Sequence, residues 1–290
     1  MNGRMEGWKI AAPNLPVFHF SSLMNRIDAT FAALRAAGRK GFIAYICAGD
    51  PDLKMTASLA REFERVGVNV LELGVPFSDP LADGVVNQLA AERALRSGTT
   101  LDGVLQTVAA LRRGGCEIPI VFYIYYNLVH RRGVERFARD AAAAGADGVL
   151  ALDLPPEEAA DYERALKRAG LCPIYLLAPT TPERRIAQVC QHASGFLYYV
   201  SREGVTGMQK SISDTIASKV AAIRRHTTLP VAVGFGVSNP QQARAVAQHG
   251  DAVVVGSAIV NQIAKGRSAR AVARFVAPMV RAVNDAHSRR

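Results

Sequence analysis

One segment decides the fold, Val70-Leu-Glu-Leu-Gly-Val-Pro-Phe-Ser-Asp-Pro-Leu-Ala-Asp-Gly84. It begins as an apolar run that holds a single acid, Glu72, and then breaks at a glycine and a proline into a loop with two more acids, Asp79 and Asp83. Such a strand and loop can place two carboxylates over one pocket, and burial raises the pKa of a carboxyl towards the range that serves acid–base chemistry. The alternative is that Glu72 pairs with an Arg or Lys at the strand end, while Asp79 and Asp83 shape the loop.

Apolar runs alternate with helix-like segments on both sides of this segment. The runs are continuous, as is typical of parallel strands that are covered on both faces. Eight such units within residues 24–290 predict one (β/α)8 barrel domain with an extra N-terminal helix. An open, doubly wound sheet is the alternative fold. The eight predicted strands are 41–50, 68–73, 119–125, 148–153, 172–177, 196–200, 229–234 and 252–255.

The predicted helices lie between these strands, and Ser238 is the expected N-cap of the helix at 239–249. Residues 1–23 lack the secretion-signal order of a charged start, an apolar core and a small-residue cleavage site, so they are interpreted as an extension or a mis-assigned start and are expected to be poorly ordered. The predicted helices are 24–38, 55–66, 85–97, 101–112, 134–144, 155–169, 182–192, 212–225, 239–249, a short segment after residue 256, and 269–284.

Composition and cysteine spacing exclude several kinds of site. The chain is 49% apolar, yet no apolar run approaches the length of a membrane span. The six histidines show no ligand spacing and no cysteines form a metal-type pair, so no metal site is predicted. The cysteines are expected to be reduced, buried thiols of a cytoplasmic protein. They are Cys47, Cys116, Cys172 and Cys190.

The formal net charge of +10 raises the question of nucleic acid. Residues 261–290 supply much of it, with seven Lys or Arg against one Asp. These cations alternate with apolar residues at helical spacing and lack an aromatic stacking platform. A solvated helix face, compatible with attraction of an anionic substrate, is therefore favoured over a nucleic-acid site.

Glycine-rich turns follow the last two predicted strands, at 233–237 and 255–259. Glycines let backbone N–H groups approach an anion, and the second turn opens a helix, whose N-terminus favours negative charge. In this fold the loops after the seventh and eighth strands are the usual phosphate site. The two turns together predict a phosphate-bearing ligand, and 201–207 is a third candidate loop.

Residues 71–84 resemble the signature of the tryptophan synthase alpha chain family. The similarity extends from about residue 24 to the C-terminus and includes short motifs at 48–51, 125–127, 153–155, 201–207, 234–236 and 256–258. The resemblance implies a carbon–carbon lyase of tryptophan biosynthesis, which cleaves indole-3-glycerol phosphate into indole and glyceraldehyde 3-phosphate by a retro-aldol reaction. It further implies that indole passes to a beta chain in an α2β2 tetramer. Pyridoxal phosphate is expected only on that beta chain, and no cofactor on this one.

The resemblance also implies residue roles. Glu72 matches the catalytic acid–base glutamate, Asp83 matches the catalytic aspartate, and the loop with Asp79 and Pro80 matches the contact to the beta chain. The chain departs from the family pattern at Val85 and at two of the residues that match substrate-binding positions, Tyr45 and Tyr123. The full substrate-binding set is Tyr45, Tyr123, Asp153, Tyr198, Thr206, Gly207, Gly234, Phe235, Gly236, Gly256 and Ser257.

Apart from the resemblance, the chemistry of the residue types also suits this reaction. Cleavage needs a proton delivered to ring carbon C3 and a proton removed from the adjacent side-chain hydroxyl, and Glu72 can serve both needs. Asp83 can stabilise the cationic ring by accepting from the indole N–H. Asp153 and Asp50, at other strand ends, are expected rather to orient loops. Two alternatives remain open: a free-standing lyase that releases indole, and a non-catalytic partner that regulates a beta chain.

Overall fold

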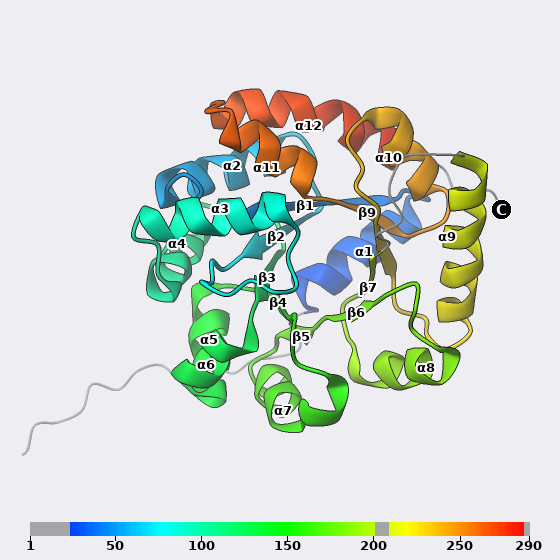
Figure 1. Cartoon of the computed structure of the whole chain (residues 1–290), viewed down its shortest axis with the longest axis horizontal. Helices are drawn as coiled ribbons and strands as arrows, with labels where there is room; N and C mark the ends of the chain where they lie inside the picture. The colour runs from blue at the N-terminus through cyan, green and yellow to red at the C-terminus, as the bar shows by residue number, and fades with distance from the viewer. Residues whose placement is uncertain (1–23, 201–208, 287–290) are drawn as a thin grey trace, which may run out of the picture.

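Parallel strands form a ring in the computed structural model, which describes residues 24–200 and 209–286 (Figure 1). The order around the ring is β5-β4-β3-β2-β1-β9-β8-β7-β6. The predicted (β/α)8 barrel is confirmed, and the open doubly wound sheet is wrong. The strands are β1 (Gly41–Cys47), β2 (Val70–Gly74), β3 (Ile120–Ile124), β4 (Gly148–Ala151), β5 (Cys172–Pro173), β6 (Tyr175–Leu177), β7 (Leu197–Val200), β8 (Val231–Gly234) and β9 (Ala252–Val255).

The ring closes at the predicted strand 172–177, which the structure divides into β5 and β6. β5 pairs with β4, β6 pairs with β7, and only Ile174 separates the two pieces. The N–H of Ile174 still donates to the carbonyl of Val149, at 2.9 Å. Pro173 has no N–H to give to a ladder, which explains why the regular pairing stops there. The eight predicted strands thus appear as nine.

The described chain has twelve α-helices and one 3₁₀ helix, η1, and apart from α1 they surround the ring (Figure 1). They are α1 (Arg26–Ala36), α2 (Leu53–Arg65), α3 (Val85–Arg96), α4 (Leu101–Arg113), α5 (Tyr126–Arg132), α6 (Val134–Ala144), η1 (Pro156–Glu158), α7 (Ala160–Arg168), α8 (Glu183–His192), α9 (Gln209–Arg224), α10 (Pro240–Ala247), α11 (Ser257–Ala264) and α12 (Ala269–Asn284).

The helices differ from the predictions in three places. The sequence missed α5, whose first N–H, that of Tyr126, donates to the Asp153 carboxylate from another strand end, at 2.7 Å. The predicted helix 155–169 is interrupted between η1 and α7. Asn239, not Ser238, is the N-cap of α10, because its side chain accepts from the N–H of Gln242.

Side chains alternate between the inside and the outside of the ring, because successive strand residues point to opposite faces. In β2, Leu71 and Leu73 pack outwards against the helices, while Val70 belongs to the cluster inside the ring. Glu72 shares the inward parity of Val70, two residues further along the strand. It lies opposite Tyr45 of β1 in the sheet register. The alternation therefore brings the single acid of β2 into the barrel near its carboxyl-terminal end.

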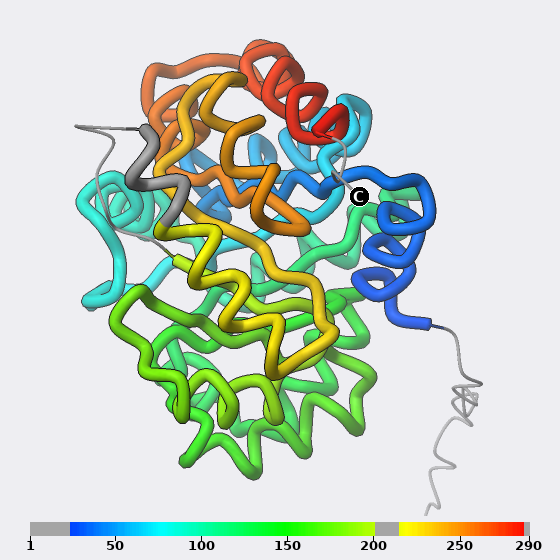
Figure 2. Tube along the Cα trace, turned by 90° about the vertical axis from the view of Figure 1, so that its right-hand side faces the viewer, coloured from blue at the N-terminus to red at the C-terminus, as the bar shows by residue number. Residues whose placement is uncertain are grey.

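The predicted N-terminal helix, α1, closes the opposite end of the barrel. Its apolar stripe, Ile27, Phe31 and Leu34, joins the cluster inside the ring. Asn25 caps α1 and also donates to the carbonyl of Asp147, at the start of β4, at 2.9 Å. Figure 2 shows α1 (blue) on the side of the barrel away from the cyan chain that leads into α3. The carboxyl-terminal end, here called the mouth, is the end that α1 leaves uncovered.

Two predictions made from composition concern the whole chain. In the part that the structure describes, no helix is long and apolar enough to cross a membrane. All four cysteines are buried and free. Residues 1–23 lie outside the described residues, so their assignment as a leader stays a prediction.

Candidate active site

Glu72 lies at the bottom of a pocket in the mouth. Its residue surface is 1% exposed, and Oε1 has no hydrogen-bond partner among the described residues. Burial, with a further contribution from the charge of Asp83, raises the pKa of Glu72 to about 8. A carboxyl with this pKa is mostly protonated near neutral pH and can both give and take a proton. The alternative interpretation, a strand-end ion pair, gains no support from the described residues, since none of their Arg or Lys side chains is bonded to Glu72 Oε1.

Three tyrosines surround the acid. Tyr45 and Tyr123 meet edge to face, with ring centroids 5.0 Å apart, and Tyr198 lines the same pocket. Burial raises the pKa of all three well above the ordinary tyrosine value, so they stay protonated. Two strand-end glycines make room for the rings. A Cβ on Gly74 would lie 2.6 Å from the Tyr45 hydroxyl, and one on Gly234 would lie 2.7 Å from a ring carbon of Tyr198.

Asp83 is held at the edge of the pocket by two tyrosine hydroxyls. Tyr123 donates to Oδ1 and Tyr125 donates to Oδ2, both at 2.9 Å. The Tyr125 hydroxyl also accepts from the N–H of Ala82, which fixes the loop before α3. Among the described residues that line the pocket, Asn87 and Tyr123 are present and Asp83 is not. The structure thus places the carboxylate one hydrogen bond away from the pocket surface.

The opposite wall of the pocket is a glycine-rich rim at the ends of β8 and β9. Gly236 has φ +60°, in the left-handed region that favours glycine. Gly256 is the N-cap of α11 and gives it no side-chain cap, so the first N–H groups of that helix are available to an anion. The predicted rim residues all line the pocket that holds Glu72. They are Gly234, Phe235, Gly236, Gly256 and Ser257.

The structure separates some predicted residues from this pocket. Asp153 accepts from the N–H of Tyr126 and lines a neighbouring hollow with Arg185, away from Glu72. This position gives no support to the prediction that Asp153 binds substrate. It supports the expectation that Asp153 orients a loop. Thr206 and Gly207 lie outside the described residues. The pocket that holds Glu72 has a volume of about 130 Å³.

Sequence reasoning missed Asn87 and the specific role of Tyr125. Asn87 lies in the first turn of α3, four residues after Asp83, and its amide nitrogen is 3.4 Å from Asp83 Oδ1. Its Oδ1 is buried without a partner in the described chain. The available signal was proximity in the sequence, since Asn87 follows Asp83 by four residues, just inside the predicted helix 85–97.

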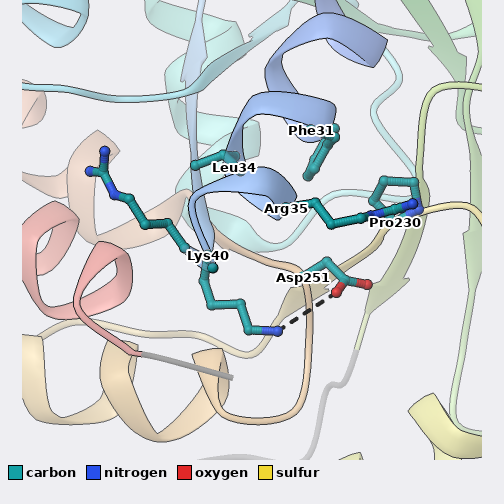
Figure 3. Close-up of a pocket in the computed structure, with 8 residues that line it drawn as sticks. Phe31, Leu34, Arg35, Lys40, Pro230 and Asp251 are labelled. Carbon is teal, nitrogen blue, oxygen red and sulfur yellow. Dashed lines mark ion pairs between the residues drawn. The ribbon is translucent and has the colours of Figure 1, made fainter. Parts of the chain in front are cut away.

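A further hollow lies at the closed end of the barrel, between α1 and the starts of β8 and β9 (Figure 3). It contains several cations, yet they do not converge on one point. Lys40 is turned to Asp251, with Nζ 3.7 Å from Oδ1, while Arg35 lies beside Pro230. Arg224 also pairs with Asp251, at 3.0 Å. This hollow has the character of a structural ion-pair cluster, and the mouth remains the candidate active site.

Fold and site together define a (β/α)8 barrel with a candidate acid–base site at its carboxyl-terminal mouth. The model of the tryptophan synthase alpha chain family matches residues 31–287. The alpha chain of Opitutus terrae is 54% identical over 240 residues, covering 83% of this chain and 90% of that one. That of Geobacter sulfurreducens is 49% identical over 265 residues, covering 90% and 100%. The chain belongs to the tryptophan synthase alpha chain family, as the resemblance of 71–84 predicted.

Solved structures agree with this assignment. The crystal structure of tryptophan synthase subunit alpha from Legionella pneumophila str. Paris matches with a TM-score of 0.83 and 39% identity, covering 91% of this chain and 100% of that one. Membership of the family implies a lyase role and a beta chain as partner.

Proposed function

We infer that the protein cleaves indole-3-glycerol phosphate to indole and glyceraldehyde 3-phosphate in tryptophan biosynthesis. One observation carries this function. Glu72, a buried carboxyl with a pKa of about 8 whose Oε1 has no partner among the described residues, shares one pocket with an anion-accepting rim of backbone N–H groups. The first group suits proton transfer to carbon and from a hydroxyl, and the second suits a phosphate.

Glu72 has the two protonation states that the reaction needs. Its acid form gives a proton to C3 of the indole ring, which makes the ring cationic. Its carboxylate form then takes the proton of the hydroxyl on the adjacent side-chain carbon. The bond from that carbon to C3 breaks, its electron pair returns to the ring, and an aldehyde forms. Glu72 gives one proton and takes one proton back, so it ends the step in the form in which it began. The step requires no cofactor on this chain.

The rim and the remaining acid serve binding and charge. Phosphate bound near Gly236 and the N-terminus of α11 holds one end of the substrate, so that remote binding energy orients the reacting carbon. The negative charge of Asp83 favours a cationic ring, and electrostatic stabilisation in a site screened from water is a large contribution to catalysis. Asp83 has its two tyrosine donors in place before substrate arrives.

The experiment that tests the function is an indole-release assay on the isolated chain. Glu72→Gln should abolish cleavage and leave phosphate-ligand binding intact, since the amide keeps the shape and loses the transferable proton. Glu158→Gln, on the exposed η1 helix, is a matched control that should cleave like wild type. Wild-type-like turnover in Glu72→Gln would remove Glu72 from the mechanism.

The loop before α3 is the proposed contact with the beta chain. Asp79 and Pro80 lie on it, and the neighbouring Leu81 and Val85 are 91% and 69% exposed. Large apolar side chains exposed together are typical of an interaction site. In the proposed α2β2 tetramer, pyridoxal phosphate belongs to the beta chain. The four free cysteines fit a reducing, cytoplasmic setting for this assembly.

A free-standing lyase has the same chemistry and lacks the partner. Adding a beta chain from a family tetramer should raise the cleavage rate and co-elute with the protein. No co-elution and an unchanged rate would favour the free-standing enzyme, and Leu81→Ser should weaken co-elution only if the tetramer forms. The third possibility is a non-catalytic regulator. It requires that the wild-type protein does not cleave indole-3-glycerol phosphate, either alone or with a beta chain.

A further inference from the structure

Helix α3 begins directly after the loop that carries Asp83, yet it buries no large side chain. Its buried residues are three alanines, which pack beside β1 and α11 (Figure 1). Two of its larger apolar residues, Val85 and Leu89, are exposed instead. Alanines make shallow contacts and bury little apolar surface, so packing alone fixes this helix weakly. The three buried residues are Ala90, Ala91 and Ala94.

An ion pair tethers the second half of α3 to the end of β1. Arg93 donates from Nε and from Nη2 to the two carboxylate oxygens of Asp50, both at 2.7 Å. Asp50 is buried, with 1% of its surface exposed. A forked pair of a guanidinium and a carboxylate fixes the angle between its partners as well as their distance. The pair therefore supplies the fixed point that the alanines do not.

The same two segments meet again just beyond the ion pair. Ser97, at the end of α3, places Oγ 3.1 Å from the carbonyl oxygen of Gly49, within hydrogen-bond distance. Gly49 has φ +83°, and a Cβ at this position would overlap the side chain of Thr99. The chain after α3 thus lies directly against the chain after β1, and Arg93 is the charged part of a closely fitted joint.

This joint lies on a short path between the two acids of the site. β1 pairs with β2 in a register that sets Tyr45 opposite Glu72, so the end of β1 that carries Asp50 is fixed relative to Glu72. At the other end of α3, Nε2 of Gln88 donates to the main-chain carbonyl of Asp83 at 2.9 Å. A displacement of α3 from β1 therefore moves Asp83 relative to Glu72.

We propose that Arg93 is a positioning residue for the cleavage reaction, and that its pair with Asp50 holds α3 where Asp83 acts on the reacting ring. Tyr123 and Tyr125 hold the carboxylate oxygens of Asp83, whereas α3 holds its main chain. Without the tether the main chain shifts and the negative charge is misdirected. Charge stabilisation acts in the transition state, so the misplacement costs rate rather than binding. This inference rests on the proposed function.

The test measures kcat and KM for indole-3-glycerol phosphate on the isolated full chain, below the melting transition of every variant. The variants are Arg93→Met and Arg93→Lys. The matched control is Arg96→Met, which removes an exposed arginine that pairs with Glu92 on the same helix. Thermal melts give the folded fraction of each protein. Calorimetry with glycerol 3-phosphate tests the glycine-rich rim separately.

Arg93→Met should lower kcat by roughly 10- to 100-fold, the cost of a small displacement of a group that acts in the transition state. Its KM and its affinity for glycerol 3-phosphate should stay within about threefold of wild type, because the lost interaction is made only in the transition state. Arg93→Lys keeps the charge and loses the fork, so it should recover most of the rate and remain roughly two- to fivefold slower than wild type. Arg96→Met should match wild type.

A combination of variants shows whether Arg93 acts through Asp83. Tyr125→Phe removes one of the two hydroxyls that hold the Asp83 carboxylate. If Arg93 and Tyr125 position the same group, the loss of kcat caused by Arg93→Met should differ by at least about threefold between the Tyr125→Phe and wild-type backgrounds. Equal losses in the two backgrounds would give Arg93 a role in fold stability only.

Other results would also overturn the assignment. A wild type that cleaves the substrate, beside an Arg93→Met variant with unchanged kcat, would refute the positioning role and leave the proposed function standing. A loss of rate that equals the loss of folded fraction would refute it too. If Arg93→Met does not fold, the comparison passes to Arg93→Lys, and a wild-type kcat in that variant would refute the proposal. A wild type that cleaves nothing would refute both the proposal and the proposed function.

Discussion

Replacing Glu72 by glutamine should change how the stability of the protein depends on pH. Burial, with the charge of Asp83, raises the pKa of Glu72 from 4.5 to about 8 in the folded state. In the unfolded chain the carboxyl returns to its ordinary value, so between the two pKa values the unfolded state ionises and the folded state does not. The stabilising contribution of the protonated carboxyl is complete below 4.5 and is lost as pH rises towards 8.

The magnitude follows from the size of the shift. Each pH unit between the two values lowers the free energy of unfolding by about 1.4 kcal/mol in wild type, and by nothing at this site in Glu72→Gln. The difference between wild type and variant should therefore change by about 4 kcal/mol from about pH 4.5 to about pH 7.5, in favour of the variant. A constant offset from the added –NH₂ group does not affect this change with pH.

Urea unfolding followed by circular dichroism at several pH values in this range measures the effect. Wild type and Glu72→Gln should diverge steadily, and Glu158→Gln, an exposed glutamate, should follow wild type. Parallel stability curves for wild type and Glu72→Gln would refute the reasoning, because they would mean that Glu72 ionises equally in both states. The proposed proton delivery near neutral pH would then have no basis.

Three further predictions concern the same end of the barrel. The kcat/KM for cleavage should fall as pH rises through about 8, where Glu72 loses the proton it must deliver; a flat profile to higher pH would exclude it as the acid. Gly74→Ala places a Cβ 2.6 Å from the Tyr45 hydroxyl, so it should displace the ring, cost about 1–3 kcal/mol in a thermal melt and weaken ligand binding. Arg93→Met leaves Asp50 buried without its two 2.7 Å hydrogen bonds and should cost about 2–4 kcal/mol, whereas an unchanged melting temperature would show that the pair adds nothing.

The sequence predicted the fold and the position of Glu72 because both depend on short-range patterns. Strand parity alone turns Glu72 inwards beside Val70, and apolar runs that alternate with helices leave few topologies. The break in regular strand pairing at Ile174 was not predicted, because Pro173 interrupts the hydrogen bonding without interrupting the apolar run. The helix α5 was missed because a carboxylate from a distant strand end, that of Asp153, supplies its first hydrogen bond.

The contacts around Asp83 could not be predicted from the order of residues. The acid was identified, yet its hydrogen bonds to Asn87 and Tyr123 depend on where α3 and β3 place their side chains. The hydroxyl of Tyr125 holds the loop before α3, because it accepts from the N–H of Ala82 and donates to Asp83. Hydrogen bonds between side chains that are distant in the sequence produce no periodic residue pattern from which they could be predicted.

Helix α1, which closes the far end of the barrel, has a practical consequence for handling the protein. Its first residues bond the start of β4, and Asn284 at the end of α12 bonds the main chain of Lys40 at the start of β1, at 2.8 Å. Both ends of the described chain therefore leave the molecule on the face away from the mouth. An affinity tag, a fused protein or a solid support attached directly before residue 24 or after residue 286 should leave the reacting face open to solution and to a docking subunit.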